Sequence, residues 1–186
     1  TLKVVPEAKA IMEQAPPQTW LVITEMWCGD SAQNLPVMEA MAALAPAIDV
    51  RIVRRDTHLD LIDLYLTNGT RSIPKLVAFD ASGDLLFTWG PRPASASELV
   101  LGNKTKPEAE RLDKDALAEA LHRWYATNGG VETQVELAKL VAEAAAAASK
   151  GDLPTLSEMI RTPSGRSAEV AVLAATQEHI AAHLNS

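Results

Sequence analysis

The sequence predicts an α/β fold in which helices flank a central mixed sheet, followed by an extra helical extension at the C-terminus. Two observations support this architecture. Before residue 128, short runs of apolar and β-branched residues alternate with stretches whose apolar residues recur at helical spacing. After Asn128-Gly129-Gly130 the composition changes to alanine-rich helix, interrupted by glycine and proline. We therefore expect one domain over residues 1–128 and a helical extension over residues 129–186.

The first part of the chain predicts two strands joined by a helix. A pair of prolines ends an initial helical stretch, and residues 19–24 then form a buried strand rich in apolar and β-branched side chains. A helix is expected from about Ser31 to Leu44, and residues 48–53 should form the second strand. This strand-helix-strand unit should be parallel.

The middle of the chain predicts the rest of the sheet and two further helices. Residues 59–66 should be helical, and strands at 75–79 and 85–89 should pair as an antiparallel hairpin, the first of them in the middle of the sheet. Helices are expected at 93–101 and 108–126. Because the second of these carries a stripe of apolar side chains, we expect it to close the second face of the sheet.

The C-terminal extension predicts one helix over 131–149 and another over 168–184. His179 and His183 stand four residues apart in the latter, a spacing that allows two imidazoles to meet one metal ion. No third ligand accompanies them in the sequence, so we interpret them as an exposed helix face. We therefore expect no metal site and, without a glycine-rich phosphate loop, no cofactor. Alanine-rich helices of this kind are candidates for pairing between chains into a homo-oligomer.

Charge and composition limit the classes of partner. A formal net charge of -7 would repel nucleic acid. The cluster of Arg51, Arg54 and Arg55 lies in a strand that alternates its faces, so we interpret it as surface. No run of about 18 apolar residues is present to cross a bilayer, so we expect no membrane partner. A single cysteine cannot form an internal disulfide, which fits a reducing cytoplasm.

The chemically distinctive site is that cysteine, Cys28, in the turn Trp27-Cys28-Gly29-Asp30-Ser31. It lies between a strand and a helix, and a helix N-terminus stabilises a thiolate through its unpaired N–H groups and positive dipole end. Ser31 can offer the sulfur a hydroxyl hydrogen bond, whereas the charge of Asp30 opposes a thiolate. Most lone cysteines are small buried hydrophobes. Placement at a turn beside an aromatic residue favours a reactive site instead.

These residues resemble the thioredoxin superfamily, whose active-site turn is Trp-Cys-Gly-Pro-Cys after the first core strand. Pro36 lies where the family's helix proline lies, and Gly69 to Pro74 is similar to the family's loop of glycine-x-arginine-x-isoleucine-cis-proline. Gly90 follows at the end of the hairpin, as in the family. The resemblance covers about residues 5–126. Trp-Cys-Gly-Asp-Ser together with Trp-Gly-Pro-Arg-Pro is similar to a bacterial subgroup that keeps one cysteine.

The resemblance implies a thioredoxin-like fold with Cys28 and Ser31 in the catalytic positions. Ser31 stands where the family has its resolving cysteine, so this chain cannot resolve a mixed disulfide at Cys28 by itself. Val22 replaces the buried acid of the dithiol enzymes, leaving Glu25 as the nearest carboxylate. The implied substrate groove is lined by Trp27, Gly29, Asp30, Ile73, Pro74 and Gly90.

Two functions remain open from the sequence. In the first, Cys28 is a monothiol that exchanges with protein thiols or disulfides, or with a glutathione-like thiol. In the second, the chain is a non-catalytic module that binds a protein partner through the groove at Cys28 and Pro74, or through its C-terminal helices.

Overall fold

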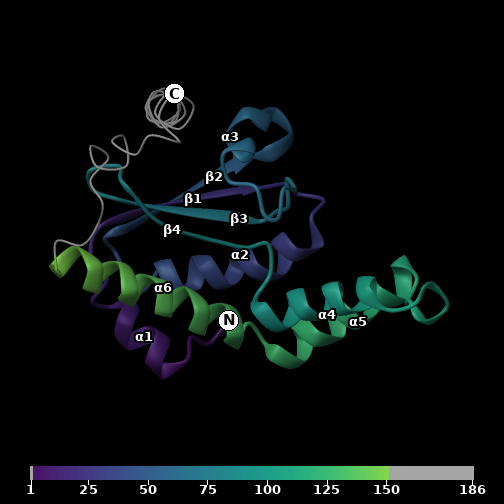
Figure 1. Ribbon diagram of the computed structural model, residues 1–186. Coiled ribbons are helices and arrows are strands. Elements are labelled where there is room, and N and C mark those ends of the chain that lie inside the picture. Colours follow the sequence, from purple (N-terminus) through teal and green to yellow (C-terminus); the bar gives the residue numbers. More distant parts are fainter. Residues whose placement is uncertain (1, 151–186) are drawn as a thin grey trace.

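The computed structural model describes residues 2–150, which form helices around a four-stranded sheet (Figure 1). The strands lie in the order β2-β1-β3-β4. Their bounds are β1 Gln18–Thr24, β2 Ile48–Arg54, β3 Lys75–Asp80 and β4 Leu85–Trp89. The α/β class and the four predicted strands are confirmed. The helix expected over 168–184, with its two histidines, lies outside the described residues.

The sheet is mixed because its connections are of two kinds. β1 and β2 are joined through the helix α2 (Gly29–Ala42) and pair in parallel. β1 and β3 pair antiparallel in the centre, and β3 continues into β4 through a tight hairpin. In that turn the Asp80 carboxylate accepts hydrogen bonds from the backbone N–H groups of Ser82 and Asp84.

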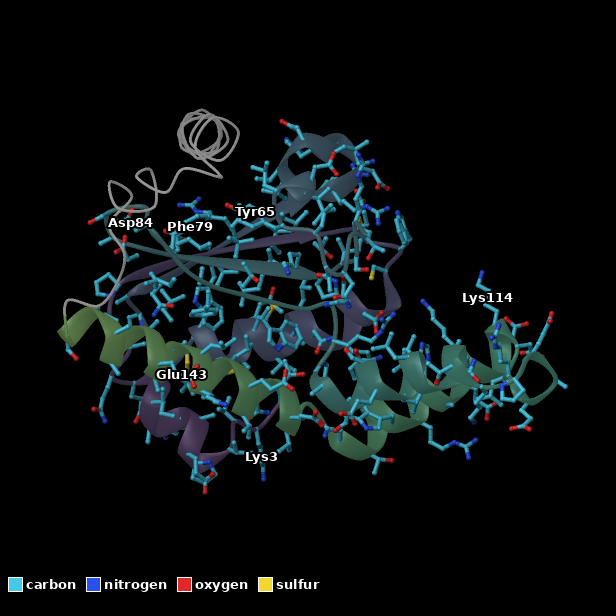
Figure 2. The ribbon with its side chains drawn as sticks, in the orientation of Figure 1. Lys3, Tyr65, Phe79, Asp84, Lys114 and Glu143 are labelled. Atoms are coloured by element: carbon cyan, nitrogen blue, oxygen red, sulfur yellow. The ribbon has the colours of Figure 1, made fainter. Side chains whose placement is uncertain are left out.

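The two faces of the sheet carry separate apolar clusters, because successive side chains of a strand point to opposite faces. Trp20 of β1 faces the larger cluster, which packs under α1 (Pro6–Met12), α2 and α6 (Val131–Lys150). On the opposite face a smaller cluster lies under α3 (Leu59–Asp63). Figure 2 shows Phe79 and Tyr65 on this second side, and Cys28 belongs to the same cluster.

Helix α6 confirms the helix predicted over 131–149 and contributes directly to the larger cluster. Leu137 is fully buried, and the side-chain oxygen of Gln134 accepts a hydrogen bond of 2.7 Å from the backbone N–H of Val5. The first helix of this region therefore packs on the N-terminus and on α2. The division into domains at residue 128 stays a prediction. No helix among residues 2–150 is long and apolar enough to span a membrane.

The prediction that a helix over 108–126 closes the second face of the sheet is wrong. Residues 108–110 form a short 3-10 turn, and the helix α5 runs from Lys114 to Asn128. It packs beside α4 (Ala94–Thr105), and the two extend away from the sheet (Figure 1). Four residues of the apolar stripe predicted for this helix line a surface groove instead, namely Leu112, Ala116, Ala120 and Trp124. The second face of the sheet is covered by α3. α3 itself ends at Asp63, earlier than the predicted 66.

Candidate active site

Cys28 is the N-cap residue of α2, as the sequence predicts for a helix N-terminus. Its backbone is extended, with φ -82° and ψ 114°, and Gly29 begins the helix. The Cys28 N–H donates to the Glu25 carbonyl at 3.1 Å, and the Cys28 carbonyl accepts from the Ala32 N–H at 3.1 Å. The turn is thus fixed on both sides of the cysteine, which is buried with 8% of its surface exposed.

The sulfur of Cys28 lies against the loop that precedes β3. The Cys28 thiol donates a hydrogen bond of 3.4 Å to the carbonyl of Ile73, 45 residues further along the chain. The Ile73–Pro74 peptide bond is cis. The structure therefore brings together two of the stretches that the sequence analysis assigned to one groove.

Two exposed apolar side chains precede the cysteine. Met26 is 97% exposed and Trp27 is 64% exposed. The Trp27 ring is held at its edge and on its face: its Nε1–H donates to Asp56 at 3.3 Å, and the Arg55 guanidinium lies 5.0 Å from the ring centroid. An apolar surface next to a buried thiol suits contact with another molecule.

Ser31 does not bond to the sulfur in the described structure, contrary to expectation. The Ser31 hydroxyl accepts a hydrogen bond of 2.6 Å from the Thr24 hydroxyl at the end of β1. Both residues are buried. Ser31 therefore ties the first turn of α2 to the strand, and its catalytic role stays a prediction.

Asp30 lies in a buried cluster of polar side chains. Its carboxylate accepts hydrogen bonds from the Arg92 guanidinium, with N–O distances of 2.9 and 2.6 Å to its two oxygens. It also accepts a hydrogen bond of 3.0 Å from the Tyr125 hydroxyl. Burial, and next the Asp30 charge, raise the pKa of Tyr125 well above its ordinary value, so this phenol remains a donor.

Asn34 extends this cluster into α6. Its side-chain N–H groups donate to the Asp30 backbone carbonyl at 2.9 Å and to the Tyr125 hydroxyl at 3.0 Å. Its side-chain oxygen accepts a hydrogen bond of 2.9 Å from the Thr133 hydroxyl. Because each of these side chains is partnered, the network fixes the N-terminus of α2 against α5 and α6.

The other carboxylate named from the sequence, Glu25, is turned toward β2. It is buried, accepts a hydrogen bond of 2.8 Å from the Asp56 backbone N–H, and lies 3.5 Å from the Arg54 guanidinium. Val22 is also buried, in the apolar cluster on the opposite side of the sheet from Cys28. The position at which the resemblance implies a buried acid is therefore occupied by an apolar side chain in this chain.

Gly90 and Gly29 have different surroundings. A Cβ at Gly90, whose φ is +111°, would lie 2.1 Å from the Pro74 carbonyl oxygen. The absence of a side chain at Gly90 therefore allows its backbone to pack directly against the loop before β3. A Cβ at Gly29 would lie 3.7 Å from Nε2 of His122, which places an exposed imidazole of α5 near the turn. The substrate-binding roles of both glycines stay predictions.

Sequence reasoning missed the partners of Asp30. Arg92 stands 62 residues from Asp30 in the chain, and Tyr125 stands 95 residues away. The signal in the sequence is the motif Trp-Gly-Pro-Arg-Pro, which places Arg92 shortly after the end of the hairpin. Among residues 2–150, no group of three or more histidine, cysteine or carboxylate side chains could hold a metal ion.

Comparison with known proteins adds a family to this geometry. A family model described as Thioredoxin matches residues 2–116. A solved structure of a protein of unknown function from Pseudomonas aeruginosa has a TM-score of 0.52 at 20% identity, over 80% of this chain and 76% of that one. An HIV epitope-scaffold has a TM-score of 0.51 at 19% identity, over 75% and 74%. At such identities these structures share the fold alone. No curated protein matches the chain.

Proposed function

The chain belongs to the thioredoxin family, and we propose that Cys28 serves it as a single-thiol nucleophile in thiol-disulfide exchange. The observation that carries this proposal is the position of Cys28 at the N-cap of α2. There the unpaired N–H groups and the positive end of the helix dipole favour the thiolate.

The exchange has two steps. The Cys28 thiolate attacks one sulfur of a disulfide, forms a mixed disulfide and releases the other sulfur as a thiolate. An external thiolate, from a protein or a glutathione-like molecule, then attacks the mixed disulfide. It leaves joined to the substrate sulfur and regenerates the Cys28 thiolate. The disulfide bond is thereby transferred from one pair of sulfurs to another, without an added oxidant.

Restoring the second thiol tests the proposal. Because Ser31 cannot resolve a mixed disulfide, the native chain should form a stable adduct at Cys28 but fail to reduce insulin catalytically with a dithiol-reductase partner. A Ser31→Cys variant should reduce insulin at least about tenfold faster, since the turn and helix N-terminus are already in place. The measurement is insulin reduction, with mass spectrometry of the adduct.

The control combines Ser31→Cys with Cys28→Ser, which leaves one thiol at the second position. This double variant should be as inactive as the native chain. Equal insulin reduction by the native chain and by Ser31→Cys would contradict the proposal. So would a native Cys28 that resists alkylation at neutral pH until the protein unfolds.

A binding module is the second candidate, and the exposure of Met26 and Trp27 beside a buried sulfur favours it. In this case the apolar pair contacts a partner protein and Cys28 does not react. Cellular activity that survives Cys28→Ser but is lost in Trp27→Ala would select this function over exchange chemistry.

A further inference from the structure

We propose that Arg92 and Tyr125 are positioning residues for Cys28, acting through Asp30. They hold the Asp30 carboxylate inside the protein and neutralise it, so that its charge does not oppose the thiolate two residues earlier. This inference rests on the proposed function of Cys28, because the charge of Asp30 affects the chemistry only if the sulfur reacts as a thiolate.

The Arg92–Asp30 pair has the geometry of a strong ion pair. The guanidinium uses two nitrogens on the two carboxylate oxygens, at 2.9 and 2.6 Å. The Asp30 side chain is 10% exposed and the Arg92 side chain 25% exposed, so solvent screens the pair only in part. A bidentate, partly buried ion pair of this kind fixes the orientation of the carboxylate and also neutralises its charge.

Tyr125 and Asn34 prevent the carboxylate from turning. Tyr125 donates to the same Asp30 oxygen that accepts from Arg92 Nε, and Asn34 holds both the Tyr125 hydroxyl and the Asp30 backbone carbonyl. The first turn of α2 is therefore attached to α5 at the residue that follows Gly29. A rotation of Asp30 toward the sulfur would break these bonds together.

Removing the guanidinium would leave the buried carboxylate with Tyr125 as its side-chain donor. An unpaired negative charge near a thiol makes the thiolate less stable, and Asp30 stands two residues after Cys28 in the first turn of α2. The positive charge of Arg92 would be lost at the same time. Both changes act in the same direction on Cys28.

Other charged groups surround the turn and remain unchanged in the test. Glu25 pairs with Arg54 on the β2 side, and Asp56 pairs with Arg55 at 2.7 Å. Two further groups are His122 on α5, near Gly29, and Lys75, which directly follows Pro74 and donates to the Thr67 hydroxyl. Since these groups are common to every variant, differences between variants report on Asp30 and its partners.

The experiment measures the rate of alkylation of Cys28 by iodoacetamide as a function of pH, in the full chain. Arg92→Gln should move the midpoint of this profile up by about one pH unit, and the isosteric Asp30→Asn should move it down. Tyr125→Phe, which removes one donor, should move it up by less. Arg51→Gln is the matched control, because Arg51 pairs with Asp49 on β2 at 2.7 Å. It should leave the midpoint unchanged.

The outcomes separate this inference from the proposed function. If neither Arg92→Gln nor Asp30→Asn moves the midpoint relative to Arg51→Gln, the positioning role is wrong while Cys28 can still be a nucleophile. If the native thiol is inert across the profile, both proposals fail. Circular dichroism checks the fold of each variant. If Arg92→Gln does not fold, the downward shift in Asp30→Asn decides the question.

Discussion

At the scale of single residues, Lys75 carries a buried charge next to the candidate site. It directly follows Pro74, and its ammonium donates to the Thr67 hydroxyl at 3.2 Å. Burial lowers the pKa of Lys75 below its ordinary value of 10.5. The unfolded chain therefore holds this proton more tightly than the folded chain does. As a result, the folded state is penalised at neutral pH, and the penalty fades as the pH rises toward 10.5.

Replacing Lys75 by methionine should remove this penalty while keeping an unbranched side chain in the space. We expect Lys75→Met to raise the free energy of unfolding by about 1 kcal/mol at neutral pH. The gain should shrink as the pH approaches 10. Urea unfolding at several pH values measures both effects.

Lys139→Met is the control for this substitution, because Lys139 is exposed on α6 and pairs only loosely with Glu143, at 3.8 Å. It should change the free energy of unfolding by less than about 0.5 kcal/mol at any pH. A Lys75→Met variant that is less stable at neutral pH would show that the ammonium has a structural role that its burial does not reveal.

At the scale of elements, Gly90 allows the backbone at the end of β4 to pack directly against the backbone of the loop before β3. Its φ of +111° and the 2.1 Å approach of the Pro74 carbonyl leave no space for a Cβ. Gly90→Ala should therefore lower the free energy of unfolding by about 3 kcal/mol, because backbone and not a side chain must move. It should also speed alkylation of Cys28, because the Ile73 carbonyl that accepts from the thiol belongs to this loop, and a hydrogen bond donated by the S–H favours the unreactive neutral thiol. Thermal unfolding and iodoacetamide rates provide the two measurements.

Gly102 provides the comparison within a neighbouring element. It lies in α4, and a Cβ there would meet nothing within 4 Å. Gly102→Ala should raise the free energy of unfolding by about 0.5–1 kcal/mol through helix propensity. If Gly90→Ala behaved like Gly102→Ala, the loop before β3 would not depend on the close approach.

The elements differ in how far the sequence could predict them. Each strand is a local run of apolar and β-branched residues, and every predicted strand lies within one residue of the observed bounds. α3 ends at Asp63 and is followed by a turn in which Asn68 and Gly69 adopt positive φ, a detail that helical spacing does not report. The apolar stripe of α5 predicted a buried face, whereas most of its residues line a surface groove. The N-cap position of Cys28 was predictable because it depends on the local order of strand, turn and helix. The network around Asp30 was not, because Arg92 and Tyr125 come from distant segments.

At the scale of the whole molecule, α6 connects the candidate site to the N-terminus. Its first turns carry Thr133, which bonds Asn34 of the polar network, and Gln134, whose amide contacts Val5 and Lys3. Glu136 accepts a hydrogen bond of 2.7 Å from the Trp89 indole at the end of β4. The same helix thus contacts the sheet, α1 and α2. This arrangement predicts that α6 unfolds together with the sheet.

Leu137 on α6 tests this cooperativity. It is fully buried in the larger apolar cluster, so Leu137→Ala should lower the free energy of unfolding by about 3 kcal/mol through lost burial and a cavity. Val135, two residues earlier and exposed, is the matched position, and Val135→Ala should change the free energy of unfolding by less than about 0.5 kcal/mol.

Urea unfolding should be followed both by circular dichroism, which reports mainly helices, and by tryptophan fluorescence, which includes buried Trp20 of the sheet. The two curves should coincide and shift together in Leu137→Ala. If the helical signal alone shifted, α6 would unfold separately from the sheet, and its attachment to the polar network around Asp30 would not be needed for the fold.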